Sequence, residues 1–263
     1  MHILVTNDDG VHAPGLLALT QAAQEIAQQV TVLAPDHNWS ASGHVKTLHR
    51  PLRVNQTELA DGTPAWASDG APSDCVALAL LGFIPEKIDL VISGINPHAN
   101  LGHDVTYSGT VTAAMEAAIW GVPGFAFSID QPEDHSGAVD YQPAAQAAVQ
   151  LIGWFQQQET FPEDILLNIN VPYLPFPEIN GFRITRQGMR IYRDKLVRRL
   201  DPRGRAYYWI GGEAPTGVEE PGTDFSALWG GYVSVTPLQL DLTDSSMKKW
   251  MASQGFAEIV QDA

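Results

Sequence analysis

The protein has 263 residues, 15 basic and 30 acidic side chains, and a formal net charge of −15 at pH 7. A chain of this length can bury enough surface to fold without disulfides, and its single cysteine, Cys75, excludes an intrachain disulfide framework and a cysteine-based zinc site. The acidity argues against a nucleic-acid duplex as the main partner, because duplex binding needs a basic surface. The sequence shows no signal-peptide pattern and no apolar run long enough to span a membrane, so we expect a cytoplasmic protein without a membrane partner.

Short apolar runs alternate with amphipathic segments from the N-terminus to about residue 172. The patterns predict strands at 2–6, 30–35, 89–96, 124–129 and 165–172, and helices at 16–27, 73–81, 110–120 and 143–157. Cys75 is expected in the core, and Ser73 is a candidate N-cap of its helix. Strands that are apolar on both faces and separated by helices predict an α/β fold, a mostly parallel sheet with helices on both faces, over residues 1–180.

The pattern changes after about residue 180. Apolar runs at 182–192, 206–213 and 232–238 are separated by Gly, Pro and charged turns, and a last helix is expected at 245–257. Residues 181–263 are therefore predicted to form an antiparallel hairpin arm and a terminal helix that complete the fold. Nine basic and two acidic residues lie between 183 and 205, a net charge of +7 that leaves −22 for the remainder. This segment is either a solvated hairpin or an arm that meets an acidic partner surface or an anionic ligand.

Polar residues follow three of the predicted strands. Asn7, Asp8, Asp9 and Gly10 follow the first strand, residues 36–40 follow the second, and Gly94, Ile95 and Asn96 end the third. Ligands of doubly wound sheets bind beyond the carboxyl ends of the strands, so these side chains are expected at one edge. Oxygen donors suit a hard cation such as Mg²⁺, Mn²⁺ or Ca²⁺. The alternative is that Asp8 and Asp9 cap the helix that starts near residue 14.

A second polar segment, Ser108-Gly109-Thr110, begins the predicted helix at 110–120. Free N–H groups and hydroxyls at a helix N-terminus can bind a phosphate, although an ordinary Ser or Thr N-cap would show the same sequence. The loop before it, which includes Asn100, could fold over the same edge of the sheet.

Eleven short motifs follow one another along nearly the whole chain: TNDDG (6–10), APG (13–15), APD (34–36) with Ser40, DCV (74–76), SGIN (93–96), ANLG (99–102), YSGTV (107–111), NINVP (168–172), TRQ (185–187), YYW (207–209) and GYVSVTPL (231–238). Together they resemble the SurE family of stationary-phase survival proteins. Pro97 and His98 depart from the small or basic residues that often follow SGIN, and they flank the expected substrate loops.

The resemblance implies a Rossmann-like core and a metal-dependent nucleotidase that hydrolyses nucleoside 5′- and 3′-monophosphates, with short polyphosphate as a further substrate. By motif match, Asp8, Asp9, Ser40 and Asn96 would bind one divalent ion, Mg²⁺ or Mn²⁺, and Asp8 and Asp9 would be catalytic. The substrate-binding residues would be Asn7, Asn100, Ser108, Gly109 and Thr110. The resemblance also implies a homodimer, or a dimer of dimers, formed through the C-terminal arm.

Two other classes of protein remain open from the residues. A nucleotide-sensing module would use Asp36 to hold a ribose and would bind nucleotides without turnover. A glycosyltransferase-like enzyme would use the aspartates to bind a metal and a nucleotide sugar. No GxGxxG, Walker A, HExxH or GxSxG motif is present to support the corresponding enzyme classes.

Overall fold

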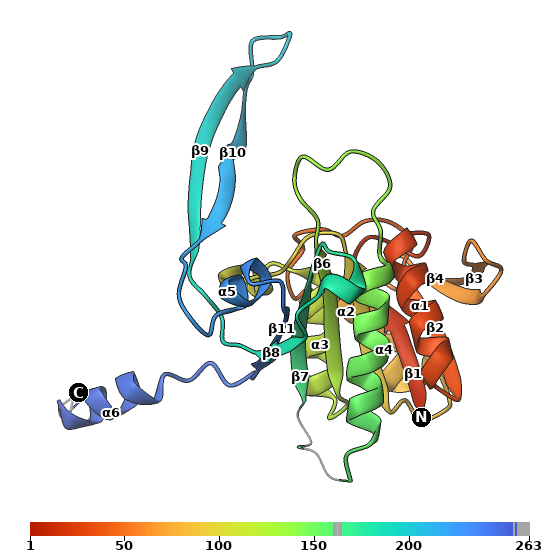
Figure 1. Ribbon diagram of the computed structural model, residues 1–263. Coiled ribbons are helices and arrows are strands. Elements are labelled where there is room, and N and C mark those ends of the chain that lie inside the picture. Colours follow the sequence, from red (N-terminus) through yellow and green to blue (C-terminus); the bar gives the residue numbers. More distant parts are fainter. Residues whose placement is uncertain (160–161, 163–164, 255, 257–263) are drawn as a thin grey trace.

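A computed structural model describes residues 1–159, 162, 165–254 and 256 (Figure 1). Within these residues a nine-stranded sheet has the strand order β3-β4-β2-β1-β5-β6-β7-β11-β8. Its centre consists of β1 (His2–Thr6), β2 (Gln29–Pro35), β5 (Leu90–Asn96), β6 (Gly124–Asp130) and β7 (Leu166–Pro172). These five strands run parallel to one another, which confirms the predicted mostly parallel sheet.

Helices cover both faces of the sheet (Figure 1). On one face α1 (Pro14–Ile26) packs against α4 (Gln142–Gln156), and on the other α2 (Pro72–Leu78) packs against α3 (Gly109–Ile119). In β1, Ile3 and Val5 join the core beneath α1 and α4, whereas Leu4 joins the core that contains Cys75. Side chains alternate across a strand, so a strand covered on both faces is apolar throughout. Cys75 is fully buried, as predicted.

The region between β2 and α2 contains a hairpin that the sequence patterns did not predict. It is formed by β3 (Val54–Glu58) and β4 (Pro64–Ser68), which pair antiparallel at one edge of the sheet. The helix after it begins at Pro72 and continues into a π-helical turn, Ala79–Phe83. Ser73 does not cap this helix, so that prediction was wrong; its hydroxyl donates instead to the carbonyl oxygen of Val45.

Residues after 180 contribute to the main sheet as well as to an arm. The predicted strand at 182–192 is two strands, β8 (Phe182–Ile184) and β9 (Arg190–Leu200). Between them the chain turns to dock on an unpredicted helix, α5 (Asp224–Trp229), where the Gly188 N–H donates to Asp224 Oδ1 at 2.8 Å. The last strand, β11 (Val233–Leu238), was expected in the separate lobe but lies in the main sheet, antiparallel to β7 and parallel to β8.

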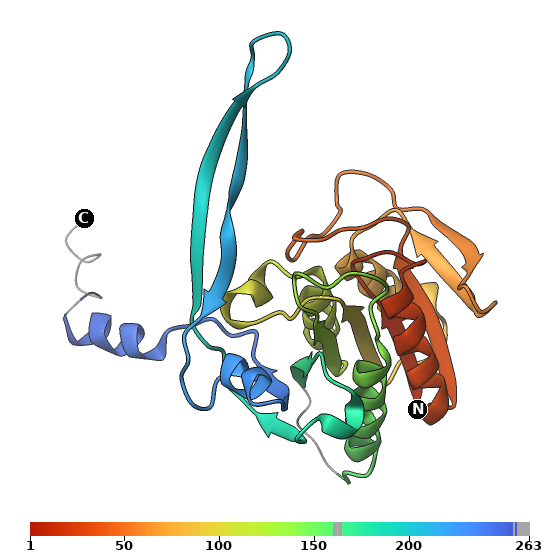
Figure 2. The ribbon, with the colours of Figure 1, turned by 45° about the horizontal axis from the view of Figure 1, so that its top comes forward.

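The predicted hairpin arm is formed by β9 and β10 (Ala206–Gly217), which make a separate two-stranded antiparallel sheet. It projects away from the main sheet in both views, and α6 (Ser245–Ser253) also lies apart from the other helices (Figures 1 and 2). The predicted terminal helix was longer; its positions 255 and 257 are outside the described residues. The described residues also include two 3-10 turns, Gly102–Thr106 and Phe176–Glu178. No helix in the described ranges has the length and apolar character needed to cross a bilayer.

Candidate metal centre

The three polar strand ends lie at one edge of the sheet. β1 is flanked by β2 and β5, and all three run parallel, so the residues that follow or end them lie side by side. The chain passes from β1 to β2 on one side of β1 and later enters β5 on its other side. The carboxyl end of β1 is therefore a switch point of the sheet, where ligands of α/β proteins bind. Gly94 in β5 allows a close approach to β6, because a Cβ there would lie 2.3 Å from the Phe127 carbonyl oxygen.

Asp8 and Asp9 form the centre of this edge. The Asp8 side chain is almost completely buried (4% exposed), and Asp9 is partly buried. Burial raises the pKa of Asp8, and burial together with the charge of Asp8 raises the pKa of Asp9 to about 6. Neither carboxylate forms an ion pair with a basic side chain in the described part of the chain. They also do not cap α1, whose N-cap is Ala13, so the capping alternative is wrong.

The first turn of α3 faces Asp8. The Thr110 hydroxyl donates to Asp8 Oδ1 at 2.5 Å, and the N–H groups of Gly109 and Thr110 oppose the effect of burial by lowering the Asp8 pKa. Gly109 is required by this proximity, because a Cβ there would lie 2.6 Å from the Asp8 Cβ. Ser108 is the N-cap, and its Oγ accepts the Val111 N–H at 3.1 Å. The segment expected to bind phosphate therefore also orients a carboxylate.

Asn38 links the aspartates to the Ser40 loop. Its Nδ2 donates to Asp9 Oδ1 at 3.3 Å, while its Oδ1 accepts the Ser40 N–H at 2.7 Å. The Trp39 N–H donates to the Asp8 carbonyl oxygen at 2.7 Å. The sequence analysis included Asn38 among the polar residues after the second strand but assigned it no role, since only the folded chain brings residue 38 next to residue 9.

Asn96, the fourth expected ligand, is the last residue of β5. Its Nδ2 donates to the His98 carbonyl oxygen at 2.5 Å. This hydrogen bond within the loop fixes the orientation of the Asn96 amide and hence of its Oδ1. Asn96 comes near Asp8 and Asp9 through the adjacency of β5 and β1.

Two residues expected to bind substrate are engaged in local structure. Asn7 is buried, and both polar atoms of its amide bond the backbone of Gly10, which shapes the turn that presents Asp8 and Asp9. Asn100 is also buried; its Nδ2 donates to Ser128 Oγ at 2.9 Å, and its backbone bonds Asn168 and Asn170. These contacts give Asn7 and Asn100 a positioning role in the two loops.

The loop that carries Ser40 is attached to α2 and α3 by two buried carboxylates that the sequence analysis did not identify. Glu116 of α3 accepts hydrogen bonds from His44 Nε2 at 2.9 Å and Lys46 Nζ at 3.2 Å. Asp74 of α2 accepts the N–H of Thr47 at 2.8 Å and its hydroxyl at 2.6 Å. The sequence feature that could have identified them is a single acidic residue in each helix, among neighbours that are apolar or have small side chains.

The donor set fits a hard divalent cation. No group of three or more His, Cys, Asp or Glu side chains in the described residues could hold a metal ion, so a zinc-type cluster is not found there. Asp8 is buried, the adjacent Asp9 is partly buried, and neither forms an ion pair with a basic side chain in the described residues. Ser40 and Asn96 are the neutral oxygen donors expected beside them. Carboxylate, hydroxyl and amide oxygens are the donors that Mg²⁺, Mn²⁺ and Ca²⁺ prefer, and a divalent charge balances two carboxylates.

Comparison with known proteins shows which family the chain belongs to. A family model described as "Survival protein SurE" matches residues 3–194. The chain belongs to the SurE family. It is 52% identical over 244 residues to a 5′-nucleotidase SurE of Herpetosiphon aurantiacus, with 93% of this chain and 94% of that protein covered.

Two further relatives span almost the same length. A 5′-nucleotidase SurE of Chloroflexus aggregans is 50% identical over 254 residues, which cover 95% of this chain and 99% of that protein. The crystal structure of a SurE protein from Aquifex aeolicus is 39% identical, with a TM-score of 0.79, and the match covers 97% of this chain and 100% of that one. The fold and family expected from the sequence motifs are confirmed.

Proposed function

We propose that this chain is a divalent-metal-dependent phosphomonoesterase that hydrolyses nucleoside 5′-monophosphates to nucleoside and phosphate. The observation that carries the proposal is a pair of adjacent carboxylates, the buried Asp8 and the partly buried Asp9, at the switch point of a parallel sheet. The SurE relatives named 5′-nucleotidases support the substrate class. We extend the proposal to 3′-monophosphates and short polyphosphate, which present the same terminal phosphoryl group.

The proposed ligands of one Mg²⁺ or Mn²⁺ ion are Asp8, Asp9, Ser40 and Asn96. A divalent ion held there would polarise a phosphoryl oxygen and make a water more acidic. Thr110 and Gly109 orient Asp8, Asn38 orients Asp9, and one of the two carboxylates accepts the proton of the attacking water. The N-terminus of α3 carries partial positive charge, so residues 108–110 also stabilise the charge on the phosphoryl group.

Phosphate release from AMP and GMP tests the function. We expect release with Mg²⁺ or Mn²⁺, none with EDTA, and recovery when the metal is restored. An Asp8→Asn/Asp9→Asn double variant should be inactive, whereas Asp61→Asn, an aspartate bound to Thr63 and Gln21 on an exposed loop, should keep full activity. Full activity of the double variant would refute the metal assignment.

The same screen separates the other two classes of protein. Saturable nucleotide binding without phosphate release in any metal would indicate a nucleotide-sensing module. Sugar transfer from a nucleotide sugar, with little hydrolysis of monophosphates, would indicate a glycosyltransferase-like enzyme.

The arm suits a role in assembly, and we propose a homodimer or a dimer of dimers formed through it. Large apolar side chains on the β9–β10 hairpin are strongly exposed, including Leu196 (71%), Trp209 (62%) and Ile210 (83%). Exposed apolar surface of this kind marks interaction sites, and the basic charge of the arm complements the acidic remainder of the chain. Replacing Arg198 and Arg199 with Gln should lower the oligomer mass in light scattering, and an unchanged mass would argue against a charge contact.

A further inference from the structure

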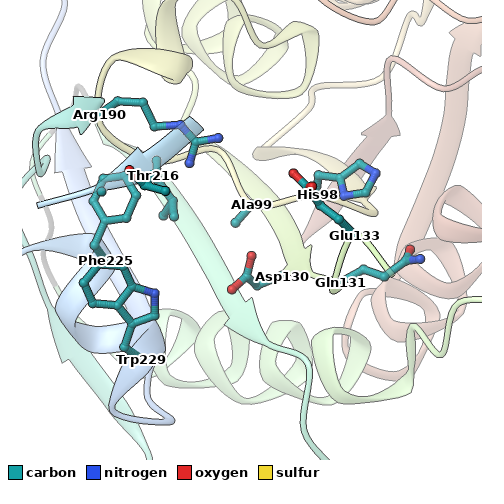
Figure 3. A pocket seen from close by; sticks show the side chains of 11 residues that line it. His98, Ala99, Asp130, Gln131, Glu133, Arg190, Thr216, Phe225 and Trp229 are labelled. Atoms are coloured by element: carbon teal, nitrogen blue, oxygen red, sulfur yellow. The ribbon is translucent and has the colours of Figure 1, made fainter. Parts of the chain in front are cut away.

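A pocket of about 640 Å³ lies beside the carboxyl ends of β5 and β6, at the edge of the sheet that carries the candidate metal centre. This is within the range of small-molecule sites, roughly 300–1,000 Å³. Figure 3 shows the side chains that line the pocket. The loop after β5, the end of β6 with its following loop, the base of the β9–β10 hairpin and α5 all contribute to it. Its lining residues are His98, Ala99, Leu101, Asp130, Gln131, Glu133, Arg190, Thr216, Gly217, Phe225 and Trp229.

Two hydrogen bonds link the chain at Asn96 and Pro97 to residues that line the pocket. The Asn96 side chain donates to the carbonyl oxygen of His98, which lines the pocket, at 2.5 Å. The N–H of Gln131, also in the lining, donates to the Pro97 carbonyl oxygen at 3.2 Å. Residues 96–98 therefore connect the expected ligand Asn96 to the wall of this pocket.

One wall of the pocket is aromatic and fixed in position. Trp229 is 55% exposed and packs against the buried Phe225, with ring centroids 5.8 Å apart. The Arg190 guanidinium lies 5.7 Å from the centroid of Phe225 and forms an ion pair with Asp104 at 2.9 Å. Figure 3 shows these three side chains on one side of the pocket. An exposed indole on a rigid support is a surface on which a nucleobase stacks.

The remaining polar groups suit a neutral ligand that carries hydroxyls. Asp130 lies between the aromatic wall and the side that carries Gln131 and Glu133 (Figure 3). Arg190 already has a carboxylate partner in Asp104, so the acidic lining groups Asp130 and Glu133 disfavour an anion here. A carboxylate accepts hydrogen bonds from sugar hydroxyls, as acidic residues do from ribose in dinucleotide-binding proteins.

We propose that this pocket binds the nucleoside half of the substrate, with the base stacked on Trp229 and the ribose hydroxyls donating to Asp130. The phosphate then lies at Asp8 and Asp9. The assignment rests on the nucleotidase function proposed above, and it makes Trp229 and Asp130 determinants of the preference for nucleotides over smaller phosphate esters.

Kinetics of Trp229→Ala test the stacking contact. Stacking of a base on an aromatic side chain is worth about 1–3 kcal/mol, so KM for AMP should rise roughly 5- to 150-fold, with kcat much less affected. Inhibition by inorganic phosphate, which has no nucleoside, should keep its Ki. Trp229→Phe should restore most of the affinity for AMP. Trp154→Ala, which removes a similarly exposed tryptophan (58%) on α4, is the matched control and should behave as wild type.

Asp130→Asn tests the ribose contact with a pair of substrates. KM should rise for AMP but change little for the 2′,3′-dideoxy analogue, which lacks the hydroxyls that Asp130 would accept. Equal effects on the two substrates would overturn the ribose contact. An unchanged KM for AMP in Trp229→Ala, or an equal rise in the Ki of phosphate, would overturn the pocket assignment.

The test of the pocket assignment can be separated from the test of the nucleotidase function. A wild-type protein that releases no phosphate from any nucleoside monophosphate refutes the function. Calorimetric titration with adenosine then decides the pocket without turnover. Binding that is lost in Trp229→Ala and kept in Trp154→Ala supports the pocket assignment, and the absence of adenosine binding refutes it.

Discussion

The hydroxyl of Thr110 donates a 2.5 Å hydrogen bond to Oδ1 of Asp8, although the two residues are 102 positions apart in the chain. Thr110 is fully buried and lies in the first turn of α3, and Asp8 follows β1. The contact holds one carboxylate oxygen in a defined direction, and in the proposed metal site the other oxygen would bind the cation. It joins the two segments that carry the proposed metal and phosphate sites.

Thr110→Val should weaken metal binding, because it keeps the shape of the side chain and removes the donor. Loss of one hydrogen-bond partner of a buried polar group lowers the free energy of unfolding by about 1–3 kcal/mol. We expect a lower free energy of unfolding by about that amount and roughly tenfold more Mg²⁺ or Mn²⁺ for half-maximal phosphate release. Thr110→Ser keeps the hydroxyl and is the control. Equal metal requirements of the Val and Ser variants would show that the hydrogen bond does not position Asp8.

Gly109→Ala should abolish most of the activity while the protein remains folded. The added Cβ would lie 2.6 Å from the Asp8 Cβ, so the carboxylate must move, and a misplacement of about 1 Å can cost roughly 10²-fold in rate. Gly153→Ala in α4 is the matched control, because a Cβ there meets nothing within 4 Å. That variant should keep activity and gain up to about 1 kcal/mol in stability. Normal kcat/KM in Gly109→Ala would refute this geometry.

A divalent cation should raise the melting temperature of the wild-type protein, because it binds the folded state at two carboxylates that otherwise repel each other. Asp9→Asn should lose this increase. Without metal the same variant should be at least as stable as wild type, since the charge that opposes Asp8 has been removed. Thermal unfolding with EDTA and with Mn²⁺ measures both effects. A large metal-induced increase in Asp9→Asn would place the cation elsewhere.

Glu116 should make stability depend on pH in a defined range. Burial raises its pKa, but hydrogen bonds from His44, Trp120 and Lys46 outweigh that effect and lower the pKa to about 2 from 4.5. A lowered pKa means that the stabilisation is complete above about pH 4.5 and is lost as the pH falls towards 2. The difference in unfolding free energy between wild type and Glu116→Gln should therefore shrink over this range.

Chemical denaturation between pH 2.5 and 7 measures this difference. Asp61→Asn is the control, because Asp61 is exposed and lies outside the contacts that attach the Ser40 loop. A difference between wild type and Glu116→Gln that is constant across the range would show that the carboxylate charge is not responsible.

The order of strands and helices up to residue 172 was readable from the sequence, apart from the β3–β4 hairpin. Buried strands such as β1 and β5 are continuous apolar runs, and this composition is visible without a structure. The β3–β4 hairpin was missed because β3 (VNQTE) is short, polar and mostly exposed at the sheet edge. The placement of β11 beside β7 was also missed, because pairing between strands depends on contacts rather than on local pattern.

The grouping of the candidate metal-site residues, which stays a prediction, has a related reason. Parallel strands place their carboxyl ends at one edge, so Asp8, Asp9, Ser40 and Asn96 could be grouped from strand positions and family motifs. Their individual partners could not be predicted. Thr110 on Asp8, Asn38 on Asp9 and the buried Glu116 that anchors the Ser40 loop are contacts between distant residues.

The features that the sequence predicted depend on interactions between neighbouring residues, because hydrophobic periodicity, turn residues and charge act over a few positions. The pocket between His98 and Trp229 depends on a different level of organisation. It exists because the chain returns after residue 180, adds β11 and β8 to the sheet and sets α5 and the base of the hairpin beside the ends of β5 and β6. Burial of β11 and α5 drives that return, and no short window of sequence encodes which surfaces then face each other.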